Sequence, residues 1–300
     1  DLPPQVLPYP YLGYVSVGVN MRGTGCSGGA FDFFEPLQQT DGYDVVEALA
    51  AQEWSTGDVG MVGISYSGYS QLYVAAMQPP HLRAITPLSP YADTYRSILY
   101  PGGILNDGFA LEWASDRQDA ARPSARPWVR SRINGGDLTC RDNQALRLQS
   151  RDLLAEIRPG RFDERPLGDY LDTTTFADRI EVPSYLAVQF QDEQTGGHAA
   201  VLAEQLLDVP GSKAVFANGT HADPLGPQEF PRVMEFIDFH VGKRIPRLGP
   251  LLRLGLPSAL ASVFEEPITL PFDRFTNQPD HATALAAYQA DLAIAEKLAA

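Results

Sequence analysis

A serine flanked by glycines stands where an apolar segment meets a helical one. Residues 63–68 read G-I-S-Y-S-G, with Ser65 between the apolar run 58–64 and a helical pattern over 66–77. At a sharp strand-to-helix turn a serine hydroxyl stands clear of the backbone and can attack a carbonyl carbon. Such a turn needs small neighbours, and Ser67 here takes the place of the second glycine of G-x-S-x-G, with Gly68 one residue later. We therefore predict that Ser65 is a nucleophile.

A carboxylate and a histidine follow in the order that such a nucleophile requires. Asp192 comes just after the apolar segment 182–188, and His221 comes after the apolar segment 213–217. A histidine takes the serine proton and returns it to the leaving group, while a carboxylate fixes the imidazole tautomer and stabilises the imidazolium. The sequence thus predicts a triad of Ser65, Asp192 and His221, each placed after its own strand. The backbone N–H of Tyr66 is the expected first donor to the oxyanion.

Other residues of the same types compete for these roles. Glu193, directly after Asp192, is an alternative acid. The remaining histidines are less well placed with respect to the predicted strands: His81, His198, His240 and His281.

The predicted elements alternate in a way that would bring these residues to one edge of a sheet. Apolar segments at 14–20, 58–64, 82–88, 182–188 and 213–217 predict strands. Apolar residues three and four apart predict helices over 41–51, 66–77 and 228–240. Strands that alternate with helices indicate an α/β fold with a mostly parallel sheet covered on both faces.

The middle of the chain breaks this alternation. Residues 93–178 show no strand pattern but have Arg/Asp-rich helical stretches and frequent glycine and proline. We expect a helical cap there, inserted between two parts of the core, 1–92 and 179–245. Residues 246–300 are expected to form a C-terminal extension that ends in an Ala-rich helix.

Composition limits the classes of function. With 44% hydrophobic and 20% charged residues the chain is ordinary for a globular protein, and its net charge is −14. Such an acidic surface repels phosphate backbones and anionic lipid, so neither a nucleic acid nor a membrane partner is expected. No cofactor or metal is expected, because a triad supplies nucleophile, base and electrostatics itself. Cys26 and Cys140 match no metal-ligand spacing and could form a disulfide or remain two thiols.

Taken together, these segments resemble the CocE/NonD hydrolases, the family of cocaine esterase and X-prolyl dipeptidyl-peptidase. The resemblance covers about residues 14–242. It rests on R-G-T-G at 22–25, S-G at 27–28, D-G-Y-D at 41–44, Q-E-W at 52–54, V-G-M at 59–61, G-I-S-Y-S-G at 63–68, A-A at 75–76, Q-P-P-H-L-R-A-I at 78–85 and Y-P-G-G at 100–103. It implies an α/β-hydrolase fold with a helical cap, a triad on Ser65, Asp192 and His221, and a small-molecule ester or peptide substrate.

The resemblance also implies parts that this sequence does not supply. The fold normally has further strands before the nucleophile, and members of the family carry a tyrosine whose hydroxyl is the second oxyanion donor and usually a C-terminal jelly-roll domain. Tyr9 and Tyr11 lie too close to segment 14–20 to match that tyrosine, and Asn20-Met21 replaces an aspartate that often precedes the R-G turn. We therefore expect a chain that lacks the N-terminal strands and the jelly-roll domain.

The substrate class stays open between two kinds of serine hydrolase and a non-catalytic fragment of one. An esterase would use Phe109 and Trp113 in the predicted cap to line an acyl pocket. An X-Pro dipeptidyl-peptidase or amino-acid ester hydrolase needs an acidic group for the substrate α-amine, for which Glu112, Asp116 and Asp119 are candidates.

Overall fold

The protein folds as two compact units. The computed structural model describes residues 9–32, 36–158, 171–265, 267–270 and 273–299. One unit, here called the sheet unit, comprises Asp1–Ser16, Tyr43–Ala92 and Phe176–Ala300. The other, the helical unit, comprises Val17–Gly42 and Asp93–Thr175. Residues 17–42 of the predicted core thus belong to the helical unit, and residues 246–300, predicted as an extension, belong to the sheet unit.

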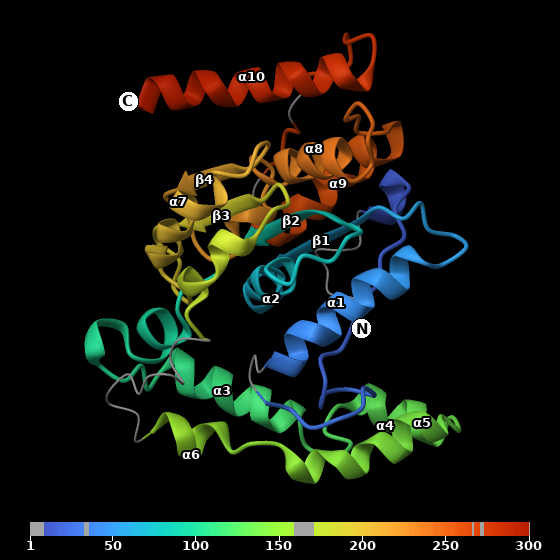
Figure 1. The fold of residues 1–300 in the computed structure, drawn as a ribbon, viewed down its shortest axis with the longest axis vertical. Helices are drawn as coiled ribbons and strands as arrows, with labels where there is room; N and C mark the ends of the chain where they lie inside the picture. The colour runs from blue at the N-terminus through green and yellow to red at the C-terminus, as the bar shows by residue number, and fades with distance from the viewer. Residues whose placement is uncertain (1–8, 33–35, 159–170, 266, 271–272, 300) are drawn as a thin grey trace. The chain divides into compact units, whose positions relative to one another are not determined.

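The sheet unit is built on four parallel strands in the order β1-β2-β3-β4. The strands are β1 (Val59–Ile64), β2 (Leu82–Leu88), β3 (Tyr185–Gln189) and β4 (Lys213–Ala217) (Figure 1). Each lies within or beside a segment predicted to be a strand, so these four predictions are confirmed. Because the strands are parallel, their carboxyl ends meet at the same edge of the sheet.

Helices cover both faces of this sheet. Helix α2 (Tyr66–Ala75) follows β1 and lies on one face, whereas α8 (Phe230–His240) lies on the other (Figure 1). The side chains of Val233, Phe236 and Ile237, at helical spacing along α8, are 0–3% exposed. Burial of this apolar stripe holds α8 against the sheet. The unit also contains α7 (Ala203–Leu206), α9 (Pro250–Phe264), α10 (His281–Ala299) and most of α1 (Pro36–Ala50), which begins in the helical unit. Its short helical turns are η2 (Tyr9–Leu12), η8 (Ala177–Arg179), η9 (Gly197–Leu202) and η10 (Asp223–Leu225).

The prediction of a strand over residues 14–20 is wrong. The structure has no strand there, and Val15, Val17 and Val19 are 64%, 46% and 56% exposed. Alternating valines favour extended backbone, but a strand also needs a neighbour for its ladder of hydrogen bonds. None of the described strands pairs with this segment.

The helical unit has no strand among its described residues. Its elements are η3 (Thr94–Leu99), η4 (Pro101–Gly103), α3 (Phe109–Ala120), α4 (Pro127–Asn134), α5 (Leu138–Asn143), η5 (Gln144–Gln149), α6 (Leu153–Ile157) and η7 (Thr173–Thr175). Cys26 and Cys140 form a disulfide within this unit, which decides between the two states that the sequence left open.

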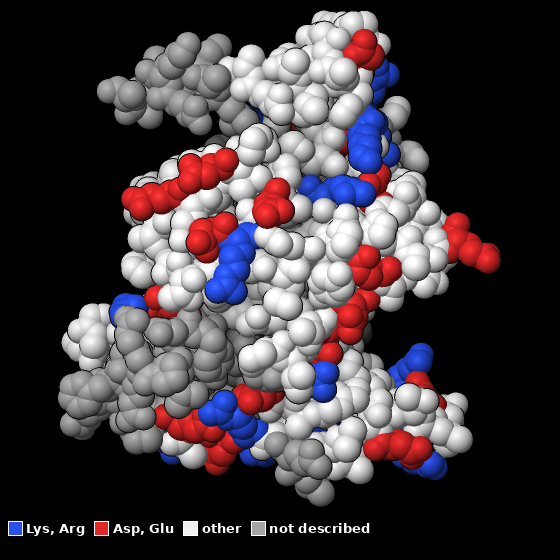
Figure 2. Space-filling model, viewed as in Figure 1, with Lys and Arg blue, Asp and Glu red and all other residues white. Residues whose placement is uncertain are grey.

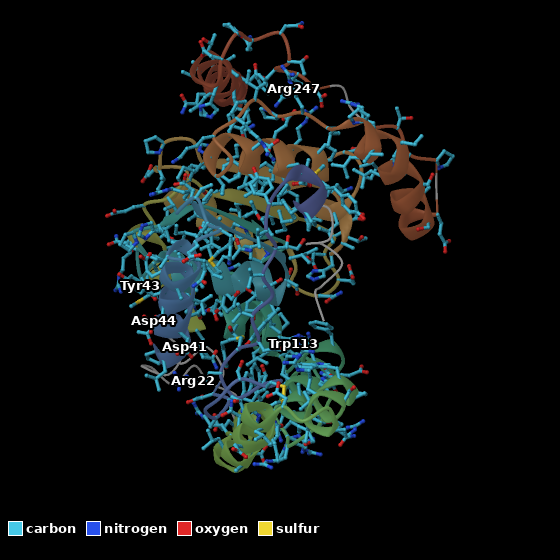
Figure 3. The ribbon with its side chains drawn as sticks, turned by 90° about the vertical axis from the view of Figure 1, so that its right-hand side faces the viewer. Arg22, Asp41, Tyr43, Asp44, Trp113 and Arg247 are labelled. Carbon is cyan, nitrogen blue, oxygen red and sulfur yellow. A yellow bond between two sulfur atoms is a disulfide. The ribbon has the colours of Figure 1, made fainter. Side chains whose placement is uncertain are left out.

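Two of the motifs that carry the family resemblance are joined in the helical unit. The guanidinium of Arg22, in R-G-T-G, donates to both carboxylate oxygens of Asp41, in D-G-Y-D, at 2.8 and 2.6 Å (Figure 3). Gly23 has φ of 75°, and a Cβ there would collide with the backbone of Phe31. The buried guanidinium of Arg147 donates to backbone carbonyls of the same turn, including that of Ser27 at 2.6 Å. These motifs therefore stabilise a loop.

Figure 2 shows acidic and basic side chains interspersed over one face of the molecule. Among the residues that the structure describes, no helix is long and apolar enough to cross a membrane.

Candidate active site

Ser65 occupies a strained turn between β1 and α2. Its φ and ψ are 62° and −127°, a region that residues other than glycine rarely adopt and that raises the energy by about 1–3 kcal/mol. The backbone N–H of Ser65 donates to the carbonyl of Leu88 at 2.8 Å, and its own carbonyl accepts from Tyr69 at 2.8 Å. Bonds to β2 and to the first turn of α2 thus hold the serine in this conformation.

The small residues around Ser65 are required by close packing. A Cβ on Gly68 would lie 2.8 Å from the carbonyl oxygen of Leu88, so any larger residue would push α2 away from β2. A Cβ on Gly63 would lie 2.6 Å from Ser67 Oγ. Ser67 itself donates to the carbonyl of Ile64 at 2.8 Å. This bond explains how serine is accommodated where G-x-S-x-G has its second glycine.

Asp192 and His221 form a buried pair at the carboxyl edge of the sheet. His221 Nδ1 lies 2.7 Å from Asp192 Oδ2, and the two side chains are 9% and 1% exposed. Asp192 Oδ1 accepts the backbone N–H groups of Gln194 and Thr195 at 2.8 Å each, and Thr195 Oγ1 donates to Oδ2 at 2.7 Å. Burial alone would raise the pKa of Asp192, but the hydrogen bonds from His221 and Thr195 outweigh it and lower that pKa below its ordinary value. The carboxylate therefore stays ionised and orients the imidazole.

Glu193, the alternative acid, has a different contact. Its Oε2 accepts the backbone N–H of His221 at 3.1 Å. Glu193 thus holds the backbone of the histidine loop, whereas Asp192 contacts the ring.

The strand ends connect the serine to the histidine loop. Leu88, the last residue of β2, accepts the N–H of Ser65, and Ser89 donates from Oγ to the carbonyl of His221 at 2.9 Å. Ser89 also has a positive φ, 40°. No hydrogen bond joins Ser65 Oγ to His221 among the described residues, and catalytic hydrogen bonds commonly tighten only when substrate binds.

Sequence reasoning missed the residues that support the pair. Thr195 follows Asp192 by three positions, the spacing at which an aspartate caps a turn, and this D-x-x-T pattern is a signal that could have found it. Ser89 had no such signal, because its partner His221 is far away in the sequence.

The other predicted site residues lie on α2, near the start of the chain and on α3. Tyr66 is the first residue of α2, where backbone N–H groups have no partner within the helix. Tyr9 is buried against the ring of Phe230, and Tyr11 is 75% exposed. Phe109 and Trp113 are half-buried one helical turn apart on α3 of the helical unit (Trp113 is labelled in Figure 3). The described residues contain no cluster of side chains that could hold a metal ion.

A strained serine after a strand, followed by a helix and accompanied by a buried histidine–carboxylate pair at the same sheet edge, is typical of the serine hydrolases of the α/β-hydrolase class. Residues 8–223 match the X-Pro dipeptidyl-peptidase (S15) family. The chain belongs to this family of serine hydrolases, and the predicted class of fold is confirmed.

Individual relatives support the CocE/NonD resemblance. Cocaine esterase of Rhodococcus sp. is 36% identical over 104 residues, which are 34% of this chain and 18% of that enzyme. A CocE/NonD family hydrolase of Staphylococcus aureus superposes with a TM-score of 0.59 at 19% identity, covering 77% of this chain and 37% of that one. An aminopeptidase of a marine sediment thaumarchaeon gives a TM-score of 0.58 at 18% identity, covering 76% and 43%. The matched segment spans less than a fifth of the length of the curated relatives.

Proposed function

We propose that this chain hydrolyses carboxylic esters through an acyl-enzyme on Ser65. The observation that carries the proposal is the buried His221–Asp192 pair, 2.7 Å apart, at the sheet edge where β1 ends in the strained turn of Ser65.

Each residue has one role in this proposal. His221 Nε2 removes the proton of Ser65 Oγ as that oxygen attacks the ester carbonyl, and the imidazolium then protonates the departing alcohol. Asp192 keeps its negative charge and stabilises the imidazolium. The N–H of Tyr66, at the positive end of the α2 dipole, donates to the oxyanion. Water, activated by the same histidine, then attacks the acyl-enzyme and releases the acid.

An ester is preferred over an X-Pro peptide for two reasons. The identity to cocaine esterase reaches 36% over the matched segment. In addition, the acidic groups considered for binding a peptide α-amine are otherwise engaged or open to solvent: Asp116 pairs with two arginines, Asp119 with one, and Glu112 is exposed. The family match keeps X-Pro dipeptidyl-peptidase activity as the second candidate.

The test is hydrolysis of p-nitrophenyl butyrate and of Gly-Pro-p-nitroanilide by the parent chain and by Ser65→Ala. We expect turnover of the ester that falls by a factor of about 10⁶ in the variant. Ser67→Ala is the matched control, because it removes a hydroxyl from the same turn and leaves the proposed triad intact.

Two results would redirect the proposal. Faster turnover of the dipeptidyl anilide than of the ester would favour the peptidase. A folded parent with no turnover of either compound would indicate a non-catalytic fragment of such an enzyme.

A further inference from the structure

A buried amide and a buried carboxyl lie together next to the loops that carry Asp192 and His221. Gln189 is the last residue of β3 and is 0% exposed, and Glu229 precedes the first residue of α8 and is 8% exposed. Gln189 Nε2 donates to Glu229 Oε2 at 3.2 Å. The proposed chemistry does not use either residue, so their burial calls for another role.

Gln189 is in contact with both loops. The backbone N–H of Asp192 donates to the carbonyl of Gln189 at 3.3 Å. On the other side, a Cβ added to Gly219 would collide with Gln189 Oε1, so the side chain lies directly against the loop of His221. Gln191 N–H donates to the carbonyl of Gly219 at 3.1 Å, which joins the two loops to each other. A displacement of Gln189 would therefore move both members of the histidine–carboxylate pair.

Two buried acceptors of this pair lack a donor in the part of the chain that the structure describes. Gln189 Oε1 and Glu229 Oε1 are both buried acceptors without a hydrogen-bond partner among the described residues. Protonation of Glu229 would turn one of these acceptors into a donor. Burial raises the pKa of Glu229 to about 7, the bond from Gln189 opposes this rise, and the nearby carboxylate of Asp223 adds to it.

We propose that Glu229 is a positioning residue, whose protonated carboxyl holds Gln189 and through it the loops of Asp192 and His221 in their working geometry. This inference rests on the proposed hydrolase function. It assigns to Glu229 no contact with substrate.

Ionisation of Glu229 would disturb the histidine loop through Asp223. Asp223 Oδ2 accepts the backbone N–H of Thr220, the residue before His221, at 2.7 Å. A second negative charge nearby repels Asp223 and weakens this bond. Tyr185 on β3 also interacts electrostatically with Glu229, and the same tyrosine senses Arg232 and Glu235 of α8, which pair with each other, and Arg274. Activity is therefore expected to fall as Glu229 loses its proton.

The experiment is the pH profile of kcat/KM for p-nitrophenyl butyrate from about pH 5 to about pH 9, with the Ser65→Ala rate subtracted. The parent should show a bell with a falling limb near pH 7, losing about tenfold on the alkaline side. Glu229→Gln keeps the shape of the side chain and cannot ionise, so its profile should rise to a plateau. Glu235→Gln makes the same substitution on α8 and should keep the bell. A falling limb that is unchanged in Glu229→Gln, or absent from the parent, would overturn the inference.

A second readout separates this inference from the proposed function. The backbone amide signals of Gly219 and Thr220 in ¹⁵N–¹H spectra should include a titration near pH 7 in the parent that is missing in Glu229→Gln. This measurement needs no turnover. Titrations that match in the two proteins would overturn the inference, whereas an inactive parent that shows the difference would contradict only the hydrolase proposal.

Discussion

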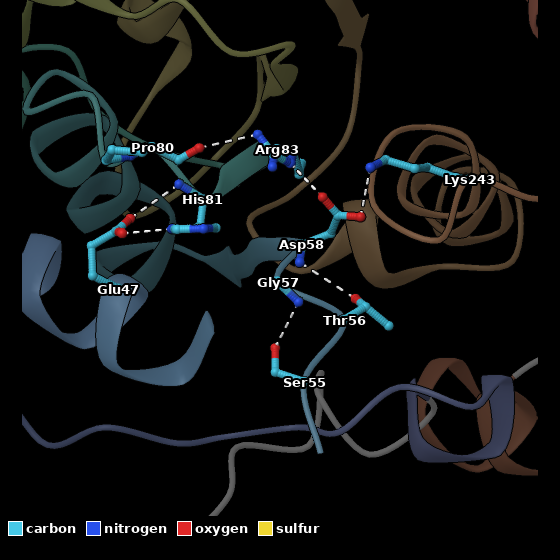
Figure 4. Close-up of polar contacts among 9 residues, drawn as sticks. All are labelled: Glu47, Ser55, Thr56, Gly57, Asp58, Pro80, His81, Arg83 and Lys243. Atoms are coloured by element: carbon cyan, nitrogen blue, oxygen red, sulfur yellow. Dashed lines mark hydrogen bonds and ion pairs between the residues drawn. The ribbon is translucent and has the colours of Figure 1, made fainter. Parts of the chain in front are cut away.

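The sheet unit contains two histidine–carboxylate pairs at opposite edges of one sheet, and only one of them has the surroundings of an active site. At the carboxyl edge His221 Nδ1 lies 2.7 Å from Asp192, and at the amino edge His81 Nδ1 lies 2.6 Å from Glu47 (Figure 4). The distances are nearly equal. The exposure differs, because the side chains are 9% and 1% exposed in the first pair and 45% and 25% in the second.

Burial and supporting donors, rather than a short distance, favour His221 and Asp192 as the proposed catalytic pair. A buried pair interacts in a low dielectric, whereas an exposed pair is screened by water. Glu47 also accepts the backbone N–H of His81 at 3.0 Å, so it fixes the start of β2. Nearby, Asp58 pairs with Arg83 and with Lys243 (Figure 4). The amino edge is thus a set of ion pairs that connect chain segments.

The largest contrast is expected between the two histidines. His221→Ala removes the general base and should lower kcat for p-nitrophenyl butyrate by a factor of about 10⁶. His81→Ala removes only a half-exposed hydrogen bond to Glu47 and should change kcat less than about twofold. Equal losses in the two variants would contradict the assignment of the base to the carboxyl edge.

Substitution of the two acidic residues, Asp192 and Glu47, should give a smaller difference in kcat than substitution of the two histidines. Asp192→Asn is expected to lower kcat about 10⁴-fold, because the imidazole loses the partner that fixes its tautomer. Glu47→Gln, the same change at the other edge, should leave kcat within about twofold of the parent. A clearly larger loss in Glu193→Gln than in Asp192→Asn would indicate that Glu193 rather than Asp192 is the acid.

Removal of a supporting donor gives an intermediate effect. Thr195→Val keeps the shape of the side chain but deletes the hydroxyl that donates to Asp192 Oδ2 at 2.7 Å. A lost hydrogen bond to a charged group amounts to about 1.5 kcal/mol, so kcat should fall about tenfold. The variant also tests the pKa of Asp192, which Thr195 helps to lower. An unchanged kcat would show that the two backbone N–H groups suffice to hold the carboxylate.

Much of this arrangement could be predicted from the sequence, because the spacing of apolar residues and the positions at which strands end are local properties of the chain. Residues close together in the chain predict β1, α2 and Ser65 between them. The turn at Ser65 can be recognised from these neighbouring residues alone. Asp192 and His221 were predicted because each follows an apolar segment, and the parallel sheet brings such ends to one edge.

The features that the sequence did not predict depend on contacts between residues far apart in the chain. Segment 14–20 has the alternation of a strand but pairs with none of the described strands, so the pattern predicted it wrongly. The bond between Gln189 and Glu229 joins residues 40 positions apart, and no spacing rule links an amide at a strand end to a carboxyl before a helix. The exposure that separates His81 from His221 is also a property of the folded chain.

The smallest expected effect concerns stability at the amino edge. Burial would raise the pKa of Asp58, but hydrogen bonds from Lys243 and Arg83 outweigh it and hold that pKa below its ordinary value. A carboxyl with a lowered folded-state pKa stabilises the fold above its unfolded pKa, and this contribution is lost as the pH falls through the folded value. Asp58→Asn should therefore lower the free energy of unfolding by about 1 kcal/mol at neutral pH and by less near pH 3, measured by urea denaturation. Ester turnover should stay unchanged, because Asp58 precedes β1 at the end of the strand opposite Ser65. A loss of kcat without a loss of stability would mean that the amino edge takes part in the chemistry, and the distinction between the two edges would fail.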